Sequence, residues 1–289
     1  MSQPPVLGAA IGRRAALGAG LALALSPALA RAEGPRPLAR APDGRPLELV
    51  FDEEFRRFDA GPSGRHVWRT VFGDGAQTGT AKRSLPSNGE LELYVDPEFA
   101  QSIGAGDLDP FAVRDGTLSI VARPAPPAVV ARGWRYVSGL ITTEPSFAQT
   151  YGYFEARARL PAGKGLWPAI WMLPADGTWP PEIDIMESIG DPAVVYMSTH
   201  SKVEPAYTKK VEVSAPAFHT YAVSWDEHQL VWYVDGVEVS RRPTPADMHK
   251  SMYLLINLAV GGAWPGSPDA STPFPAAFSV SCVRGYRFA

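Results

Sequence analysis

The sequence predicts an all-β sandwich, and three observations lead to this prediction. Short runs in which apolar and polar residues alternate recur from residue 47 to the end of the chain. Gly and Pro, with 27 and 29 residues, separate these runs as turn signals. Long stretches of helical periodicity are missing from the sequence. Many short strands joined by turns of this kind are typical of two packed β-sheets.

The composition is that of an ordinary globular protein. Of the 289 residues, 45% are hydrophobic and 20% are charged, and the formal net charge is -3. This balance argues against a nucleic acid or an anionic membrane as a partner. Cys282 is the single cysteine, so no disulfide can form within the chain. Stability must therefore come from a large hydrophobic core, which a chain of this length can provide.

Residues 1–32 are predicted to be an export signal, which places the mature protein in the periplasm or outside the cell. Arg13 and Arg14 precede an apolar run that is too short to span a membrane permanently. Ala30-Arg31-Ala32 has the pattern of a signal cleavage site. The paired arginines are typical of a twin-arginine signal, and an ordinary secretory signal is the alternative.

Residues 33–46, rich in Pro and Arg, are predicted to be a flexible segment leading into one domain, residues 47–289. Two segments of that domain, 96–115 and 123–136, carry little strand pattern and are predicted to be long loops, which often have functional roles. Asp235-Gly236, between two alternating runs, predicts a β-hairpin. Strands are predicted at residues 49–51, 90–95, 117–122, 139–143, 152–160, 167–173, 182–188, 194–200, 220–225, 230–234, 237–240, 253–259 and 278–286.

Three carboxylates lie within six residues of the predicted strand 182–188. Isoleucines alternate with Glu182 and Asp184, so these two acids share one face of the strand. Strict alternation would turn Glu187 into the apolar interior, where an ionised carboxylate is very costly. One extra residue between Asp184 and Glu187, a β-bulge, would return Glu187 to the face of the other two acids. We therefore predict three acids in a row on one face of an irregular strand.

Crowded carboxyl groups suit the cleavage of a glycosidic bond. That reaction uses two carboxyl groups, one protonated and one ionised. Neighbouring carboxylates resist being charged together, so one of them keeps its proton near neutral pH. The alternatives are a calcium site, which prefers ligands gathered from a curved loop, and an ordinary solvated strand face. A solvated face would not need the bulge, so we favour the catalytic interpretation.

The stretch Glu182-Ile183-Asp184-Ile185-Met186-Glu187 resembles the catalytic signature of glycoside hydrolase family 16. It has the bulged form, which is similar to that of β-1,3-glucanases (laminarinases) and unlike that of lichenases. The resemblance runs from about Leu49 to Phe288 and implies a β-jelly roll, concanavalin A-like, whose concave sheet forms a sugar-binding cleft. Further motifs follow the family's order at residues 51–55, 151–157, 165–174, 218–221, 232–236 and 257–262.

The resemblance implies a role for each acid. Glu182 would be the nucleophile that attacks the anomeric carbon, and Glu187 the general acid/base that protonates the leaving oxygen and then activates water. The two inversions give net retention, which requires carboxyl groups about 5–5.5 Å apart. Asp184 would hydrogen-bond Glu182 and, as a nearby negative charge, help to keep Glu187 protonated.

Four tryptophans are predicted to contact the substrate. Trp167 and Trp171 lie four residues apart on one strand and so share a face. Core packing is the alternative for this pair, but the resemblance favours stacking on sugar rings. Trp264 lies in a loop where related enzymes place a substrate-contacting Trp. Trp179, just before the catalytic strand, could line either end of the cleft.

Two polar residues complete the predicted binding site. The resemblance places a histidine at the position of His200, where it touches the substrate or the acid/base; a structural histidine is the alternative. Asn88, with Glu90, resembles an Asn-x-Glu motif at the edge of the cleft.

No metal and no cofactor is expected. The five histidines show no metal-ligand spacing. Many relatives bind a structural calcium through an Asp in the last strand, but Ser281 occupies the matching position, and a hydroxyl is a weaker calcium ligand than a carboxylate. Asp52, Glu53 or Glu54 could still supply part of a site.

The leading hypothesis is an exported, monomeric, retaining endo-β-glycanase with a polysaccharide substrate, β-1,3-glucan or β-1,3/1,4-glucan. Segments 136–142, 149–153 and 179–182 also resemble bacterial glycanases that trim exopolysaccharides such as succinoglycan. A transglycosylase would use the same acids and pass the sugar to another sugar. A non-catalytic lectin on this fold is a further alternative. Such a lectin would be expected to lack a catalytic carboxylate, and all three carboxylates are present.

Overall fold

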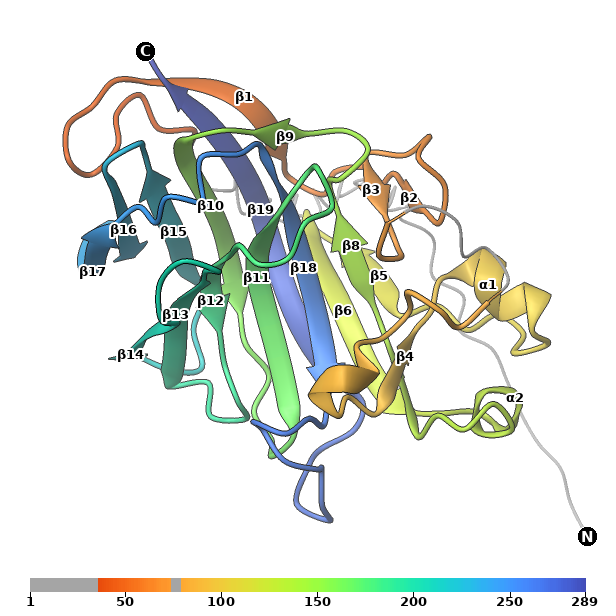
Figure 1. Ribbon diagram of the computed structural model, residues 1–289. Helices are drawn as coiled ribbons and strands as arrows, with labels where there is room; N and C mark the ends of the chain where they lie inside the picture. The colour runs from red at the N-terminus through yellow and green to blue at the C-terminus, as the bar shows by residue number, and fades with distance from the viewer. Residues whose placement is uncertain (1–35, 74–78) are drawn as a thin grey trace, which may run out of the picture. The chain divides into compact units, whose positions relative to one another are not determined.

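Two large β-sheets pack face to face in the computed structural model of the chain (Figure 1). The structure describes residues 36–73 and 79–289. The predicted export signal, residues 1–32, lies outside the described residues. Within the described ranges, one sheet has ten strands and the other nine, which confirms the predicted all-β sandwich.

The ten-stranded sheet is called the back sheet here. Its strands are β1 (Leu47–Glu53), β4 (Glu92–Tyr94), β5 (Phe111–Arg114), β6 (Thr117–Pro124), β7 (Tyr136–Ser138), β10 (Gly152–Arg159), β15 (His219–Trp225), β16 (Gln229–Val234), β17 (Val237–Pro243) and β19 (Ala276–Phe288). They follow the order β17-β16-β15-β10-β19-β6-β7-β4, with β1 beside β19 and β5 beside β6.

The nine-stranded sheet is called the cleft sheet. Its strands are β2 (Ala60–Gly61), β3 (Trp68–Arg69), β8 (Leu140–Thr142), β9 (Ala148–Gln149), β11 (Leu166–Pro174), β12 (Glu182–Glu187), β13 (Val194–His200), β14 (Tyr207–Glu212) and β18 (Met252–Val260). They follow the order β14-β13-β12-β11-β18-β8-β3-β2, with β9 beside β18. The centre of this sheet is therefore formed by β12, β11 and β18.

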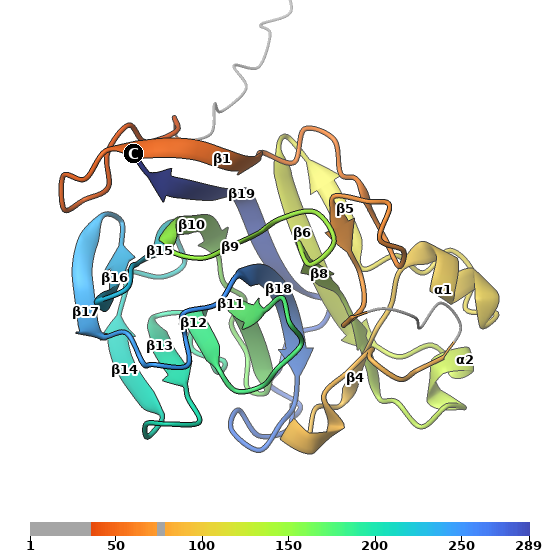
Figure 2. The same ribbon diagram turned by 45° about the horizontal axis from the view of Figure 1, so that its top comes forward.

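The two segments predicted as long loops contain short regular elements. The first holds the helix α1 (Pro97–Ser102) and strand β5, and the second holds the helix α2 (Pro127–Val130). Helix α1 begins where it does because the Asp96 side chain accepts a hydrogen bond from the Phe99 N–H at 2.9 Å. Both helices lie beside β4, away from the centre of the cleft sheet (Figure 2). A third short element, the 3-10 helix η1 (Pro86–Asn88), precedes β4.

The segment leading into the domain packs on the back sheet where the structure describes it. Ala41 is buried, and the Leu38 N–H donates to the Tyr286 hydroxyl at 3.1 Å. Arg45 forms an ion pair with Asp226 at 2.7 Å. This part of the predicted flexible segment is thus held by specific contacts. Every helix in the described ranges is too short or too polar to cross a membrane.

The hydrophobic core fills the space between the two sheets. Ile170 and Met172 of β11 and Ile256 of β18 enter it from the cleft sheet, and Phe154 of β10 and Val223 of β15 enter it from the back sheet. Because successive residues of a strand alternate between faces, the remaining residues of β11 and β18 face away from the core. That outer face of the cleft sheet carries the candidate site.

Strand β12 contains the predicted bulge. Its register against β11 shifts between Asp184 and Glu187, where Ile185 is left without a partner residue on β11. The register against β13 shifts at the same place. Ile185 and Met186 both lie in the core with no exposed surface. Two consecutive apolar residues thus face inward, and Glu187 returns to the outer face beside the other acids.

A hydrogen bond across the sandwich fixes the bulge. The indole N–H of Trp232, on β16 of the back sheet, donates to the backbone carbonyl of Asp184 at 2.9 Å. Trp232 is fully buried, so no water competes for this carbonyl. The bulge in one sheet is therefore tied to the other sheet.

We predict that Trp232→Phe destabilises the fold more than Trp225→Phe does. Both tryptophans are fully buried, but the Trp225 N–H has no hydrogen-bond partner among the described residues, so its replacement removes packing alone. Trp232→Phe also leaves the Asp184 carbonyl without its donor, which adds about 1–2 kcal/mol to the loss of unfolding free energy in urea titrations. Hydrogen exchange in β12 should accelerate only in Trp232→Phe. Equal losses of unfolding free energy in the two variants would contradict the proposal that the Trp232 hydrogen bond fixes the bulge.

Candidate active site

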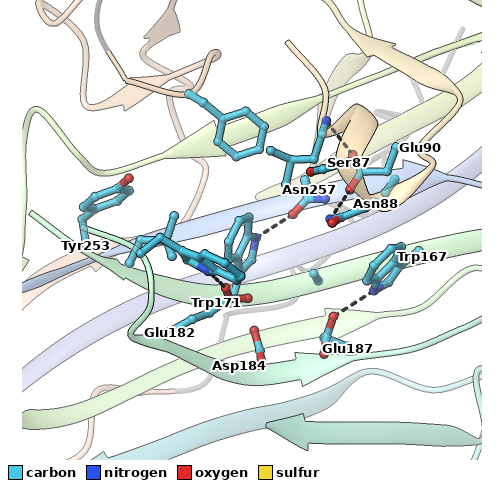
Figure 3. A pocket seen from close by; sticks show the side chains of 16 residues that line it. Ser87, Asn88, Glu90, Trp167, Trp171, Glu182, Asp184, Glu187, Tyr253 and Asn257 are labelled. Atoms are coloured by element: carbon cyan, nitrogen blue, oxygen red, sulfur yellow. Dashed lines mark hydrogen bonds between the residues drawn. The ribbon is translucent and has the colours of Figure 1, made fainter. Parts of the chain in front are cut away.

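A cleft of about 410 Å³ opens on the outer face of the cleft sheet (Figure 3). Strands β11, β12 and β18 form its floor, and the segment around η1 forms one wall. Most of the predicted site residues line it, namely Glu182, Asp184, Glu187, Trp167, Trp171, Trp179 and Asn88. His200 and Trp264 lie beside this lining and contact it. The fold therefore brings together most of the site residues that were predicted from the sequence.

Glu187 is held as a carboxylic acid. Its side chain is 8% exposed, and its carboxyl accepts a hydrogen bond from the indole N–H of Trp167 at 2.9 Å (Figure 3). Burial, reinforced by the negative charge of Glu182, raises the pKa of Glu187 to about 8. Hydrogen bonds from Trp167 and Ser198 oppose this rise but do not cancel it. At neutral pH, Glu187 can therefore donate a proton into the cleft.

Asp184 lies deeper than the other two acids. It is 1% exposed, and this burial raises its pKa well above the ordinary value, with the charges of Glu182 and Glu187 adding to the effect. We expected Asp184 to act as a negative charge beside Glu187, but the structure favours its protonated form. The charge that raises the pKa of Glu187 is that of Glu182. A hydrogen bond between Asp184 and Glu182, as expected, also raises the pKa of Asp184, which is the effect of a bond in which Asp184 is the donor.

Glu182 is the most accessible of the three acids. It is only partly buried, and it accepts a hydrogen bond from the indole N–H of Trp179 at 2.6 Å. His200 lies directly opposite on β13, and its Nε2 is 3.5 Å from Asp184 Oδ2. His200 thus lies close to Asp184, while its contact with the substrate or the acid/base, which the resemblance implies, stays a prediction. A carboxylate that is open to the cleft and oriented by donors can serve as a nucleophile.

The predicted tryptophan pair lies along β11 on one face. Trp171 is 8% exposed and packs with Tyr94 and Tyr253 in a cluster under the cleft. Trp167 stands at the Glu187 end, and Trp264 packs edge-on against it with ring centroids 5.7 Å apart. Trp264 is 41% exposed, so it offers an aromatic surface next to the cleft rather than in its wall.

Several site residues were missed by the sequence reasoning. Asn257 on β18 accepts a hydrogen bond from the Trp171 indole N–H at 2.7 Å and fixes the orientation of that ring (Figure 3). Tyr253, on the same strand, also lines the cleft. The sequence did hold a sign of the role of Asn257, which is a polar residue in the strongly apolar run 252–260. This run is wholly buried in the structure, and a buried amide in a strand needs hydrogen-bond partners.

The residues at the expected calcium position do not fit a calcium ion. The Ser281 hydroxyl accepts a hydrogen bond from the Arg157 guanidinium at 3.1 Å, so a cation already lies there. Asp52 and Glu54 both bind the Arg284 guanidinium, and Glu53 accepts from the Trp68 indole N–H. In the described ranges, one set of potential metal ligands lies within 4.8 Å of one another, and it is Glu182, Asp184 and His200 of the catalytic cluster.

Comparison with known proteins places these features in a family context. The sequence model described as "Glycosyl hydrolases family 16" matches residues 87–277. An endo-1,3-1,4-beta-glycanase, ExsH, of Rhizobium meliloti (strain 1021) is 40% identical over 247 residues, which cover 83% of this chain and 52% of that protein. The chain therefore spans about half the length of this relative. A beta-glucanase of Rhodothermus marinus is 38% identical, over 70% of this chain and 75% of that protein.

The structural comparison agrees. The X-ray structure of an endo-beta-1,3-glucanase from Pyrococcus furiosus matches with a TM-score of 0.71 and 31% sequence identity. The match covers 86% of this chain and 97% of that chain. It supports the jelly-roll arrangement expected from the sequence.

We predict that Glu187→Gln stabilises the protein at pH 7. The folded-state pKa of about 8 lies above the ordinary 4.5, so between these values the folded protein holds a proton that the unfolded chain releases. Raising the pH through this window therefore favours unfolding, and Gln removes the effect. Urea titrations should show a gain on the order of 2 kcal/mol at pH 7 that shrinks toward pH 4. The exposed Glu227→Gln is the control and should show no such gain; a destabilised Glu187→Gln would contradict the assignment.

Proposed function

The chain belongs to glycoside hydrolase family 16, and we propose that it is a retaining endo-β-glycanase that hydrolyses internal β-glycosidic bonds of a polysaccharide. One observation carries this proposal. A single cleft holds a protonated carboxyl group, Glu187, close enough to Glu182 for the charge of one to shift the pKa of the other. A neutral acid beside an accessible carboxylate is the pair that double displacement at a glycosidic bond needs.

In the first step Glu182 attacks the anomeric carbon, and Glu187 gives its proton to the leaving oxygen. The Glu182 carboxylate becomes an ester and loses its negative charge. Because that charge helps to raise the pKa of Glu187, the pKa falls when the ester forms. Glu187 is then ionised and can take a proton from the water that cleaves the ester. The same two groups thus complete the cycle with net retention.

Asp184, Trp179 and His200 support the nucleophile in this scheme. Asp184 and the Trp179 indole N–H both donate hydrogen bonds to Glu182, so the carboxylate is oriented before the substrate arrives. His200 lies beside Asp184, at 3.5 Å from its carboxyl, and so stands next to the donor that orients Glu182.

The substrate class follows from the relatives and the cleft. Trp171 and Trp167 offer ring faces for sugars along β11, with the small Ala169 between them. Relatives named as endo-1,3-1,4-beta-glycanase and beta-glucanase support a β-1,3-glucan or β-1,3/1,4-glucan. The alternatives are an exopolysaccharide of the succinoglycan type, a transglycosylase and a lectin. A relative from Penaeus monodon named beta-1,3-glucan-binding protein, 30% identical, makes binding without cleavage a concrete alternative.

We also propose that residues 1–32 direct export of the protein and are then removed, and that the mature protein acts as a monomer. The export proposal rests on the arginine pair, the apolar run and the cleavage pattern of that segment. The monomer proposal rests on the fold of the single chain, which already brings the three acids and the tryptophans together in one cleft.

We predict that residues 33–289 release reducing ends from laminarin or mixed-linkage β-glucan. Glu182→Gln and Glu187→Gln should each lower kcat by about a thousandfold or more, and the exposed Glu212→Gln should not. Since Glu187 must be protonated to act, kcat/KM should fall as the pH rises through about 8. Cleavage of succinoglycan alone from a panel with agarose and κ-carrageenan would favour the exopolysaccharide alternative. Longer products at high substrate concentration would indicate transglycosylation, and near-normal activity of Glu182→Gln would refute the scheme.

We further propose that folding and activity need no calcium, because Arg157 supplies the positive charge at Ser281. The melting temperature should then be the same in EGTA as in millimolar calcium chloride, since a ligand that does not bind the folded state cannot stabilise it. A calcium-dependent rise in melting temperature would show a site that these residues do not explain.

A further inference from the structure

A second pair of carboxyl groups lies at the edge of the cleft. Glu90 lines the cleft and is 7% exposed, and Glu92, at the start of β4, has no exposed surface. The two residues are two positions apart in an extended segment, so their side chains share a face. Within the described ranges neither forms an ion pair with Lys, Arg or His. Two buried carboxyl groups without a cation cannot both be ionised.

Hydrogen-bond directions identify Glu90 as the ionised member. An indole N–H can only donate, so the bond from Trp171 fixes the Asn257 oxygen as its acceptor. The Asn257 NH₂ group then donates to the Tyr94 hydroxyl at 2.9 Å, and the Tyr94 O–H donates to Glu90 at 3.4 Å. Each donor in this chain leads to the Glu90 carboxylate.

Two further donors converge on Glu90. The Leu85 backbone N–H donates to one carboxylate oxygen at 3.2 Å, and the Asn88 side-chain NH₂ donates to the other at 3.1 Å (Figure 3). A carboxyl group that accepts three hydrogen bonds is stabilised in its charged form. These bonds lower the pKa of Glu90 against the rise caused by its burial.

Glu92 is in the opposite situation. The Val260 backbone N–H donates to one oxygen at 2.7 Å, and the Ser84 hydroxyl is 3.5 Å from the other. The hydrogen bonds from the backbone N–H groups of Val260 and of Glu92 itself lower the pKa of Glu92 but do not cancel the effect of burial. Complete burial raises the pKa of Glu92 well above its ordinary value, and the negative charge of Glu90 raises it further. The hydrogen bond between the two side chains acts in opposite senses, lowering the pKa of Glu90 and raising that of Glu92.

We propose that Glu92 is a neutral carboxylic acid at neutral pH that donates a hydrogen bond to Glu90, and that this bond positions the Glu90 carboxylate to accept hydroxyl groups of a sugar at the cleft wall formed by the segment around η1. Glu92 is thus a positioning residue that never touches the substrate. The sugar as ligand rests on the proposed function, whereas the location of the proton does not.

Among the described residues, the groups around Glu90 and Glu92 supply no further charge that would change how the two carboxyl groups share one proton. Tyr94 faces it from β4, and Tyr136 is opposite Glu92 on β7. Strand β18 presents an amide and a backbone N–H, neither of which titrates. Arg83, from the preceding segment, forms an ion pair with Asp96 at 2.8 Å. The net charge of the pair is then set by the two carboxyl groups themselves.

Infrared difference spectra at pH 7 test where the proton lies, without any substrate. Wild type minus Glu92→Gln should show the C=O stretch of a protonated carboxylic acid. Wild type minus Glu90→Gln is the matched control and should show the bands of an ionised carboxylate. An ionised carboxylate in the Glu92→Gln difference spectrum would overturn the proposal.

Kinetics test the positioning role on whichever polymer of the panel the wild type cleaves. Glu92→Gln keeps an N–H donor to Glu90, so KM and kcat should stay within about threefold of wild type. Glu92→Leu removes the donor, and KM should rise about tenfold or more while kcat changes little. Urea titrations establish that both variants fold.

The outcomes separate this proposal from the proposed function. A KM for Glu92→Gln as high as that for Glu92→Leu, with both folded, would show that Glu90 does not depend on a donor at position 92. Failure of the wild type to cleave any polymer would refute the proposed function, while the infrared spectra would still decide which carboxyl carries the proton.

Discussion

The cost of placing ionised carboxylates away from water governs this structure. Strand β12 must supply Ile185 and Met186 to the core and three acids to the cleft, which a regular alternation cannot do. The bulge resolves this conflict by letting two consecutive apolar residues face inward. The Trp232 indole N–H then holds the bulge from the opposite sheet. The geometry of the catalytic acids therefore depends on contacts made in the core, far from the solvent that the substrate comes from.

The same cost determines where the protons lie. In each crowded group, the more buried carboxyl is favoured as neutral, and the more accessible one accepts hydrogen bonds. Asp184 donates to Glu182 at the catalytic strand, and Glu92 stands in the same relation to Glu90 at the cleft edge. A buried neutral acid is a directional donor that adds no charge to the cleft, which suits a site that must also bind uncharged sugars.

Local pattern predicted the bulge and most of the longer strands, because both follow from which side chains a sheet can bury. It missed the short strands β2, β3, β5, β7 and β9, and it missed β14 because most residues of that strand are exposed. The alternation around Glu182 and Asp184 was sufficient to require an irregularity before Glu187, and the spacing of Trp167 and Trp171 gave their common face. Helix α1 was missed because one Asp96 cap and a proline start it, with little periodicity. The Asn257–Tyr94–Glu90 chain was missed because it joins β18 to β4 through contacts far apart in sequence. The protonation of Asp184 depends on its burial, which no local pattern reports.

The catalytic cycle uses this arrangement by changing one charge. Burial alone would raise the pKa of Glu187 permanently, and a permanently neutral acid could not act as a base in the second step. The negative charge of Glu182 also raises the pKa of Glu187, but this part of the rise disappears when Glu182 becomes an ester. Burial raises the pKa of Asp184, so that while Glu182 is ionised Asp184 is favoured as neutral and adds no second negative charge beside Glu187. A protonated Asp184 therefore makes the pKa of Glu187 responsive to the state of the nucleophile, which an ionised Asp184 would weaken.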